Sequence, residues 1–378
     1  MRATSKKLRA LMISKACIVE AYRGKLEELS RFDDVKLSVI VPPYWRDERG
    51  MMPLEGKQPR SYELIVEDMA LNGHFHLHFY PHLGRQVQRL RPDILHIEEE
   101  PYNVATLQAT WLGKRVGAKV VFFTWQNLYR RYMPPFSWIE AYNFRQADYA
   151  IAGNAGAVEV LRAKGYKGPI RVIPQFGVDP EVFKGQGARG KGQSFTIGYV
   201  GRLVEEKGPH ILLRAVARLE GDWRLRILGS GPLRSWLESL ARGVGASDRV
   251  TFDPPIPSME MPSYYNRLDV LVLPSLTRPN WKEQFGRVLI EAMACGVPVV
   301  GSDCGEIPNV IGQAGLIFPE GDADELRARL ERLMGDPYLR MRLARLGREC
   351  VLSRYTQAQI AAETYEVYRH LHASPCVV

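Results

Sequence analysis

Cysteine is scarce and scattered in this sequence. The chain has five cysteines, and no two of them form a C-x-x-C pair: Cys17, Cys295, Cys304, Cys350 and Cys376. An odd number of isolated cysteines suits a reducing compartment and argues against a zinc site. We therefore expect a cytoplasmic protein.

Long apolar runs are also missing. No stretch approaches the roughly 20 apolar residues of a membrane span. The N-terminus, MRATSKKLRALMISKA, is basic, but its apolar part is too short and too interrupted for a signal peptide, so we expect it to form the first strand. The 378 residues, 46% hydrophobic and 25% charged, indicate a soluble globular protein of two domains.

Basic residues exceed acidic ones, 51 to 42, which gives a net charge of +9. Such an excess attracts nucleic acid, anionic lipid or phosphorylated small molecules, or serves only solubility. No basic low-complexity tail is present. Six basic residues gather near the N-terminus and raise the hypothesis of peripheral membrane contact: Lys6, Lys7, Arg9, Lys15, Arg23 and Lys25.

Short aliphatic or β-branched runs alternate with helical patterns. The first half predicts strands at 8–13, 36–41, 74–80, 94–98, 119–124, 149–153 and 171–173, with helices such as 102–115 and 155–164. The second half predicts strands at 195–200, 224–228, 249–252, 270–273, 297–301 and 315–318. Strand–helix alternation predicts parallel sheets with right-handed crossovers. The fold class is therefore α/β, with two Rossmann-like domains facing across a cleft.

The segment FKGQGARGKGQS, rich in glycine and basic residues, lacks apolar periodicity and is typical of a linker. We expect an N-terminal domain at 1–183, a linker at 184–194 and a second domain at 195–353. A closing helix at 356–372, within a C-terminal segment of 354–378, is expected to return to the first domain. Ligands of open α/β sheets bind beyond the carboxyl ends of the strands, so the site is expected between the domains.

Two glycine turns follow strands in the second half. YVGRLVEEKG places Gly201, Arg202 and Lys207 after one strand, and ILGSGP places Gly229 and Gly231 after the next. Glycine allows close backbone approach, and two cations at a strand end suit a diphosphate. A surface loop with two solvated charges is the alternative.

The stretch KEQFGRVLIEAMACG holds two glutamates, Glu283 and Glu291. FGRV predicts the first turn of a helix that runs to about Cys295, and the N-terminus of a helix favours phosphate. Small residues surround Glu291, which predicts partial burial, and a buried carboxylate needs donors such as the two hydroxyls of a ribose. The alternative for Glu291 is a helical ion pair with Arg287.

E-QFGRVLI-E resembles the E-x7-E motif of retaining glycosyltransferases with the GT-B fold. GRL...KG, LGSGP, LPS and IP.VIG..G resemble the nucleotide-sugar domain of the family 4 glycosyltransferases, and PDILHIEEEP, ADYAIAGN and VIPQFGVDPEVF resemble their first half. The resemblance implies that Arg202 and Lys207 hold the diphosphate and Glu291 the ribose. It implies that Glu283 holds the transferred sugar with the backbone of Phe285 and Gly286. Four residues at the helix start are thus candidates for donor binding: Phe285, Gly286, Arg287 and Val288.

The acceptor side departs from the family pattern. The first loop, SKACIVEAYRGK, has Gly24 but no Gly-Gly turn, and FFTWQN stands where many relatives carry a histidine. Carboxylates after the strand DILHI are expected at the mouth of the cleft, with solvated surface charges as the alternative. The acceptor-side candidates are Glu99, Glu100, Trp125, Gln126, Asn127 and Arg23, with Glu98 beside them and Trp281 before the glutamate motif.

Two patterns resemble metal sites. DAD at 322–324 is better explained as a helix N-cap by Asp322, with Glu325 closing a capping box. HFHLH is expected to place His74, His76 and His78 on one face of a strand, where they would bind zinc or line the acceptor side. We expect no metal and no cofactor.

The predicted activity is transfer of a sugar from a nucleoside-diphosphate sugar to an acceptor hydroxyl, which is a glycan, a lipid-linked molecule or a small molecule. The resemblance implies retention, with the leaving phosphate taking the acceptor's proton and cations replacing a metal. The alternatives are a non-catalytic basic module for nucleic acid, which leaves the paired glutamates unexplained, and a GT-B-shaped epimerase or phosphorylase. We expect no nucleic-acid partner.

Overall fold

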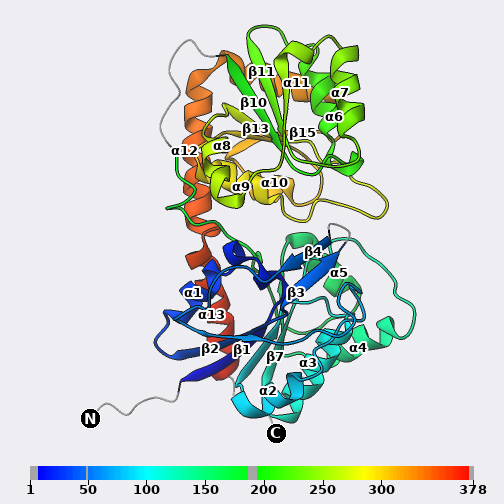
Figure 1. Cartoon of the computed structure of the whole chain (residues 1–378), viewed down its shortest axis with the longest axis vertical. Helices are drawn as coiled ribbons and strands as arrows, with labels where there is room; N and C mark the ends of the chain where they lie inside the picture. The colour runs from blue at the N-terminus through cyan, green and yellow to red at the C-terminus, as the bar shows by residue number, and fades with distance from the viewer. Residues whose placement is uncertain (1–6, 48–49, 186–193, 374–378) are drawn as a thin grey trace. The chain divides into compact units, whose positions relative to one another are not determined.

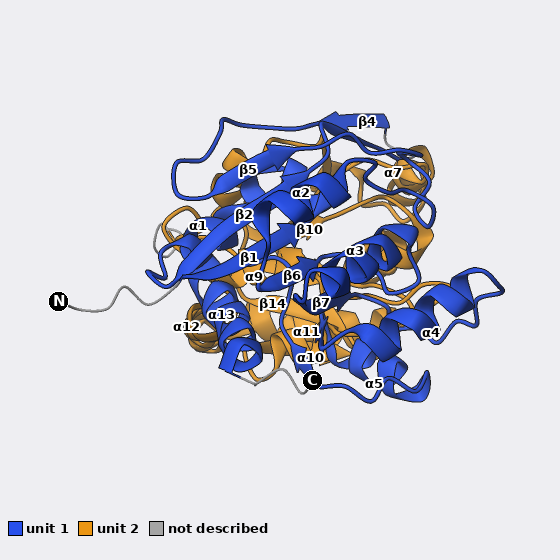
Figure 2. Cartoon of the chain, turned by 90° about the horizontal axis from the view of Figure 1, so that it is seen from below, with its two compact units in different colours: residues 1–177, 357–378 blue, residues 178–356 orange. Residues whose placement is uncertain are grey.

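The computed structural model describes residues 7–47, 50–185 and 194–373. The chain forms two compact units, residues 1–177 with 357–378 and residues 178–356 (Figure 2). Each unit is built on a parallel sheet with helices on its faces (Figure 1). The predicted class, two parallel-sheet α/β domains, is confirmed.

The sheet of unit 1 has seven parallel strands in the order β5-β2-β1-β6-β7-β8-β9. Its strands are β1 (Leu8–Ile13), β2 (Val35–Val41), β5 (Glu63–Val66), β6 (Ile94–Ile97), β7 (Lys119–Thr124), β8 (Tyr149–Ala152) and β9 (Ile170–Val172). The helices are α1 (Gly24–Ser30), α2 (Leu83–Leu90), α3 (Val104–Arg115), α4 (Phe136–Gln146), α5 (Ala155–Ala163) and α13 (Gln357–Ala373). Helix α13 packs against α1, and its Tyr368 hydroxyl lies 2.8 Å from Nδ1 of buried His96 on β6.

Unit 2 has a six-stranded parallel sheet in the order β12-β11-β10-β13-β14-β15. Its strands are β10 (Phe195–Val200), β11 (Trp223–Leu228), β12 (Val250–Asp253), β13 (Val270–Leu273), β14 (Val299–Ser302) and β15 (Gly315–Phe318). The helices are α6 (Pro209–Val216), α7 (Arg234–Gly243), α8 (Met261–Tyr265), α9 (Arg287–Ala294), α10 (Ile307–Ile311), α11 (Ala323–Gly335) and α12 (Pro337–Arg354). Every residue of β10 is buried, as expected for a central parallel strand covered on both faces.

The boundaries of the two units fall at slightly different residues from those predicted. Residues 178–185 belong to unit 2 because Val178 donates its N–H to the Tyr355 carbonyl and Asn266 donates to the carbonyl of Lys184. The first unit thus ends at residue 177 rather than 183, and the second at 356 rather than 353. Most of the expected linker, 186–193, lies outside the described residues.

The predicted strand at 74–80 is wrong. Residues 71–77 form turns, with His74 N–H donating to the Leu71 carbonyl and His78 N–H to the His74 carbonyl. His76 turns inward onto aromatic side chains, so the alternating pattern reflects local packing rather than a sheet face. Three short strands were not predicted: β5 at the sheet edge and the antiparallel pair β3 (Tyr44–Asp47) and β4 (Gly50–Pro53).

Candidate functional site

The two glycine turns of unit 2 lie side by side at the carboxyl ends of β10 and β11. Gly201 N–H donates to the Leu228 carbonyl at 3.1 Å, and Leu203 N–H donates to the Ser230 carbonyl at 2.8 Å. A Cβ atom on Gly229 would lie 1.9 Å from the Gly201 carbonyl oxygen, so no side chain fits there. The structure thus brings the three predicted glycines together: Gly201, Gly229 and Gly231.

Lys207 is held against the loop that follows β13. Gly208 has φ +64°, and a Cβ atom on it would lie 1.9 Å from the Pro274 carbonyl oxygen, so only glycine permits this approach. The Lys207 Nζ donates to Glu283 Oε2 at 2.7 Å and lies 4.8 Å from the centre of the Trp281 ring. Arg202 lies exposed at the end of β10 in the same unit.

Glu283 is fixed in a buried position, 6% exposed. Its Oε2 atom also accepts a hydrogen bond from the Ser275 hydroxyl at 2.9 Å. Its carbonyl accepts the Glu306 N–H at 3.1 Å and packs so closely on Gly305 that a Cβ atom there would lie 2.1 Å away. A buried carboxylate requires such donors, and Lys207 and Ser275 supply them.

Glu291 is equally buried, on helix α9. Its Oε2 accepts from the Tyr265 hydroxyl at 2.7 Å, and its Oε1 lies 2.7 Å from Arg287 Nε. Burial raises the pKa of this carboxyl group, although Arg287 and Tyr265 act to lower it. The predicted burial and the alternative ion pair are therefore both present.

Helix α9 begins later than FGRV predicted. Gly286 has φ +78°, outside the helical region, so the first helical residue is Arg287. The Phe285 side chain is buried with its ring 5.7 Å from that of Tyr355, so it serves packing, and its backbone remains the candidate for donor contact. Val288 lies partly exposed in the first turn.

The two glutamates belong to separate networks. Glu283 interacts with Lys207 and Ser275, whereas Glu291 interacts with Tyr265 and Arg287. Sequence reasoning missed Ser275 and Tyr265. Ser275 had a weak signal, the LPS segment directly after a strand, but Tyr265 lies one residue from Tyr264 and no spacing distinguishes the two.

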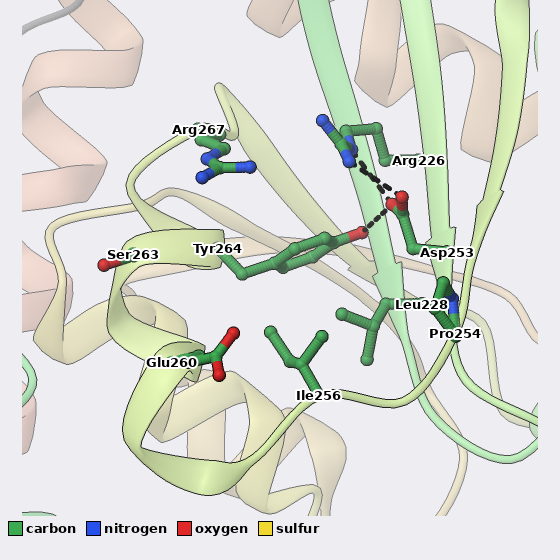
Figure 3. A pocket seen from close by; sticks show the side chains of 9 residues that line it. All are labelled: Arg226, Leu228, Asp253, Pro254, Ile256, Glu260, Ser263, Tyr264 and Arg267. Atoms are coloured by element: carbon green, nitrogen blue, oxygen red, sulfur yellow. Dashed lines mark hydrogen bonds and ion pairs between the residues drawn. The ribbon is translucent and has the colours of Figure 1, made fainter.

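A cavity of about 430 Å³, which was not predicted from the sequence, opens beside the ends of β11 and β12 (Figure 3). Arg226 makes a two-point ion pair with Asp253, at 3.0 and 2.8 Å, and the Tyr264 hydroxyl lies 3.3 Å from Asp253 Oδ2. Leu228 and Ile256 supply the apolar part of the wall. Helix α8 thus contributes Tyr264 to this cavity and Tyr265 to Glu291.

Unit 1 buries three consecutive glutamates at the carboxyl end of β6, contrary to the alternative of solvated charges. Glu98 is paired with Lys25 and accepts from the Ser14 hydroxyl at 2.7 Å. Glu99 is paired with Lys15 and lies 3.5 Å from His78 Nε2. Burial acts to raise the pKa of Glu99, but Lys15 and His78 outweigh it and lower the pKa to about 2.

Glu100 differs because its hydrogen-bond partners are neutral. Its Oε1 accepts the Trp125 N–H at 2.8 Å, and its Oε2 accepts the Thr124 hydroxyl. Burial raises the pKa of Glu100 to about 7, although these hydrogen bonds act to lower it. Glu100 therefore fixes the end of β7 and titrates near neutral pH.

The remaining acceptor-side candidates lie on the loop after β7. Trp125 Nε1 donates to Gln175 Oε1 at 3.0 Å, and Gln175 in turn donates to Glu98 Oε2 at 3.1 Å. Gln126 is buried and accepts from Lys164 at 3.1 Å. Asn127 is half-buried beside Gly156. Trp125, Gln126, Gln175, Glu98 and Glu100 are thus linked by hydrogen bonds at the carboxyl edge of the sheet, through the Thr124 hydroxyl and the Trp125 N–H.

The basic N-terminal residues do not form a basic surface. Arg23 is buried and donates to the backbone carbonyls of Cys17, Ile18 and Glu55, so its expected acceptor-side role is replaced by a structural one. Lys25 is buried against Glu98, as described above. Arg9 pairs with Asp93 at 2.7 Å, and Lys15 with Glu99. Lys7 is exposed, and Lys6 lies outside the described residues.

The DAD segment caps a helix. Asp322 Oδ1 accepts the N–H groups of Asp324 and Glu325 at 3.0 and 2.9 Å, which confirms the predicted N-cap of α11. Glu325 pairs with Arg329 at 2.8 Å. His74, His76 and His78 do not share a strand face. Within the described residues, no cluster of three or more histidine, cysteine, aspartate or glutamate residues is arranged to hold a metal ion.

Models of known protein families match both units of the chain. A family model for glycosyl transferases group 1 matches residues 185–349, and one for a glycosyl transferase 4-like domain matches residues 26–175. A D-inositol 3-phosphate glycosyltransferase of Streptomyces bingchenggensis is 36% identical over 185 residues, 45% of this chain and 39% of that protein. The lipopolysaccharide core biosynthesis glycosyltransferase LpsE of Rhizobium meliloti is 33% identical over 240 residues, 61% of this chain and 66% of its own. The matched regions thus cover less than half of the first of these relatives.

Solved structures show the same fold. A sucrose-phosphate synthase from Thermosynechococcus elongatus matches with a TM-score of 0.74 at 20% identity, over 98% of this chain and 100% of its own. Anabaena HepE, crystallised with UDP, matches with a TM-score of 0.72 at 18% identity, over 96% and 100%. In the part of the chain that the structure describes, no helix has the length and apolar character needed to cross a bilayer. The chain belongs to the glycosyltransferases with the GT-B fold, of the family 4 type.

Proposed function

We propose that this protein transfers a sugar from a nucleoside-diphosphate sugar to an acceptor hydroxyl. The observation that carries the proposal is the ion pair between Lys207 and Glu283 at the carboxyl edge of the unit 2 sheet, in the unit that also buries Glu291. This combination supplies a cation for phosphate, a fixed carboxylate for sugar hydroxyls and a second carboxylate for ribose.

On the donor side, Arg202 and Lys207 neutralise the diphosphate, and the N-terminus of α9 adds the positive end of its helix dipole. Because Gly201 and Gly229 have no side chain, the two turns pack closely together at the strand ends, where the phosphates are proposed to bind. Glu291 accepts hydrogen bonds from the ribose, a role that the nearby Arg287 and Tyr265 tune by sharing its oxygens. Because cations of the chain carry the charge of the leaving group, the reaction needs neither metal nor cofactor.

Transfer proceeds with retention at the anomeric carbon. The bond from the anomeric carbon to the leaving phosphate oxygen breaks, and the acceptor oxygen forms its bond on the same face. The departing phosphate takes the acceptor's proton. Glu283 stabilises the positive charge that develops on the sugar, and the hydrogen bond from Lys207 at 2.7 Å holds that side chain in place.

The acceptor binds on unit 1, at the polar network after β6 and β7. Trp125, Gln126 and Asn127 supply aromatic and amide groups there, which suit hydroxyl-rich molecules, and the buried Glu100 fixes the Trp125 backbone. Glu99 stays an acceptor-side candidate, although its side chain is buried against Lys15 and His78. Two relatives are named as a D-inositol 3-phosphate glycosyltransferase and a glycosyltransferase of lipopolysaccharide core biosynthesis, which supports a glycan, a lipid-linked molecule or a phosphorylated polyol as the acceptor. The four described cysteines are all free, which accords with a cytoplasmic location.

Incubation with a panel of nucleotide sugars tests the proposal. Slow release of nucleoside diphosphate, followed by mass spectrometry, is expected for one donor and is expected to fall sharply in Glu283→Gln. Glu320→Gln, an exposed glutamate of the same unit, is the matched control and is expected to keep the parent rate. Absence of turnover with every donor, together with tight binding of a polynucleotide, would favour the nucleic-acid alternative. Interconversion of the sugar without transfer would favour an epimerase.

A further inference from the structure

Two segments of unit 1 contain no aspartate or glutamate, although 42 residues of the chain are acidic: residues 69–92 and 101–139. The second segment includes the loop between β7 and α4, which reads WQNLYRRYMPP and carries Arg130 and Arg131. Any surface that these segments form together has basic groups and no carboxylate of its own. Such a surface favours an anionic partner.

The two segments are joined by aromatic packing around His76. Its ring centre lies 5.1 Å from that of Phe136, 5.7 Å from that of Tyr132 and 5.1 Å from that of Tyr102. Tyr132, in the second segment, also contacts Lys164, whose Nζ lies 4.7 Å from the centre of the Tyr132 ring. The loop before α4 is thus anchored at Tyr132, and its neighbours in sequence are held at the surface.

Those neighbours expose large apolar side chains. Met133 is 80% exposed, Trp138 69% and Tyr129 53%. Phe75 and Leu77, on either side of His76, are exposed as well. We call these residues together with the two arginines the aromatic–arginine face: Phe75, Leu77, Tyr129, Arg130, Arg131, Met133 and Trp138. Single exposed apolar residues are ordinary, but several on an anchored loop, the helix that follows it and the segment packed against it mark an interaction site.

We propose that the aromatic–arginine face docks this protein on an anionic lipid bilayer. Tryptophan and tyrosine prefer the boundary between headgroups and acyl chains, Met133 and Leu77 bury apolar area there, and Arg130 and Arg131 meet lipid phosphates. A nucleic-acid surface fits less well, because its affinity rests on many phosphate contacts, whereas this face has two arginines and exposes apolar side chains such as Met133, which is 80% exposed. This proposal does not rest on sugar transfer, and it uses residues other than the N-terminal lysines and arginines.

Co-sedimentation tests the face with two matched triple variants of the full chain. The first is Tyr129→Ser, Arg131→Ser, Met133→Ser. The control is Tyr338→Ser, Met341→Ser, Arg342→Ser, which removes the same residue types and the same charge from exposed positions of α12 in unit 2. Vesicles of phosphatidylcholine alone are compared with vesicles that also contain phosphatidylglycerol, without donor or acceptor.

The parent and the control are expected to bind the anionic vesicles equally, and the first variant at least about tenfold more weakly. Vesicles of phosphatidylcholine alone are expected to bind the parent more weakly than anionic ones. Equal binding of the two variants, or no binding of the parent to anionic vesicles, overturns the proposal. So does binding of the parent to a single-stranded polynucleotide but not to vesicles, with loss in the first variant, since that assigns the face to nucleic acid.

Fluorescence quenching gives a readout that depends on depth rather than on affinity. Lipids brominated on their acyl chains are expected to quench the parent more than Trp138→Phe. Trp236→Phe, which removes an exposed tryptophan of α7, is expected to keep the full quenching. Equal quenching of the parent and Trp138→Phe would show that Trp138 does not enter the bilayer and would contradict the proposal.

Discussion

Lys207 and Glu283, 76 residues apart in sequence, form an ion pair with Nζ and Oε2 at 2.7 Å. Lys207 follows β10 and Glu283 follows β13, which are neighbouring strands, so the sheet order brings the two loops together. In the proposed function the lysine serves the phosphates and the glutamate serves the sugar. The ion pair therefore connects the side chain proposed to bind the leaving phosphate with the side chain proposed to bind the transferred sugar.

The cations of the donor site are expected to dominate nucleotide binding. Arg202→Ala and Lys207→Ala are each expected to weaken binding of a nucleoside diphosphate by about 1.5–3 kcal/mol, the loss of one charged hydrogen bond. Arg218→Ala, in the turn that follows α6 and paired with Asp324, is the matched control and is expected to keep the parent affinity. Calorimetry decides; unchanged affinity in both site variants would remove the phosphates from this location.

The ion pair itself is expected to appear as a coupling energy. Lys207→Met removes the cation that donates to the buried Glu283 carboxylate, and Glu283→Gln removes the charge of the carboxylate. In a double-mutant cycle on unfolding, the two changes are expected to couple by about 0.5–3 kcal/mol. Additive effects of the two substitutions on the urea midpoint would mean that the pair contributes nothing to stability.

Glu100 predicts a pH dependence of stability. Its pKa of about 7 lies above 4.5, its value in an unfolded chain, so between pH 4.5 and 7 the folded state holds a proton that the unfolded state has lost. Stability therefore falls as the pH rises through this window, by up to about 3 kcal/mol from this group.

Glu100→Gln removes this titration while keeping an acceptor for the Trp125 N–H. The variant is expected to match the parent at pH 5 and to exceed its stability at pH 8, as measured by urea unfolding. Glu366→Gln, an exposed glutamate of α13 in the same unit, is the control and is expected to follow the parent at both pH values. Identical curves for parent and Glu100→Gln would show that Glu100 is ionised throughout.

Removal of metal ions tests whether side chains of the protein, and not a bound metal, neutralise the charge of the leaving diphosphate. Turnover is expected to survive exhaustive treatment with EDTA, because Arg202, Lys207 and the start of α9 compensate the leaving diphosphate. Loss of activity that magnesium or manganese restores, while zinc does not, would assign that role to a bound metal instead.

The central strands could be predicted because burial on both faces leaves a continuous apolar run. β1, β7, β10 and β13 coincide with the predicted ranges for this reason. The edge strand β5 and the hairpin of β3 and β4 are short and partly exposed, so their residues carry no such run. The strand predicted at HFHLH was wrong because residues 71–77 form turns, in which the inward-facing His76 packs on aromatic rings while Phe75 and Leu77 are exposed, an alternation that a strand would also produce.

The site was predictable where it depended on turns and charges next to strands. Glu283, Lys207 and the glycines follow strand ends, a position that can be read from sequence. The partners Ser275 and Tyr265 depend on which loops the sheet order brings together, and sequence spacing does not encode that. The burial of Glu98, Glu99 and Glu100 depends likewise on Lys15, Lys25 and Thr124, which reach them from other strands and loops.

The roles proposed for Glu291, on α9, and for Glu283, in the segment before α9, can be tested most directly by comparing their glutamine variants. Glu291→Gln is expected to weaken binding of both the bare nucleoside diphosphate and the nucleotide sugar, because the carboxylate proposed to bind the ribose hydroxyls is lost. Glu283→Gln is expected to leave affinity for the bare nucleotide almost unchanged and to lose turnover, because its charge acts on the sugar in the transition state. Nucleotide affinity by calorimetry and turnover by product release, measured on both variants, decide the matter. Equal loss of nucleotide affinity in both, or loss in Glu283→Gln alone, would contradict this division of roles.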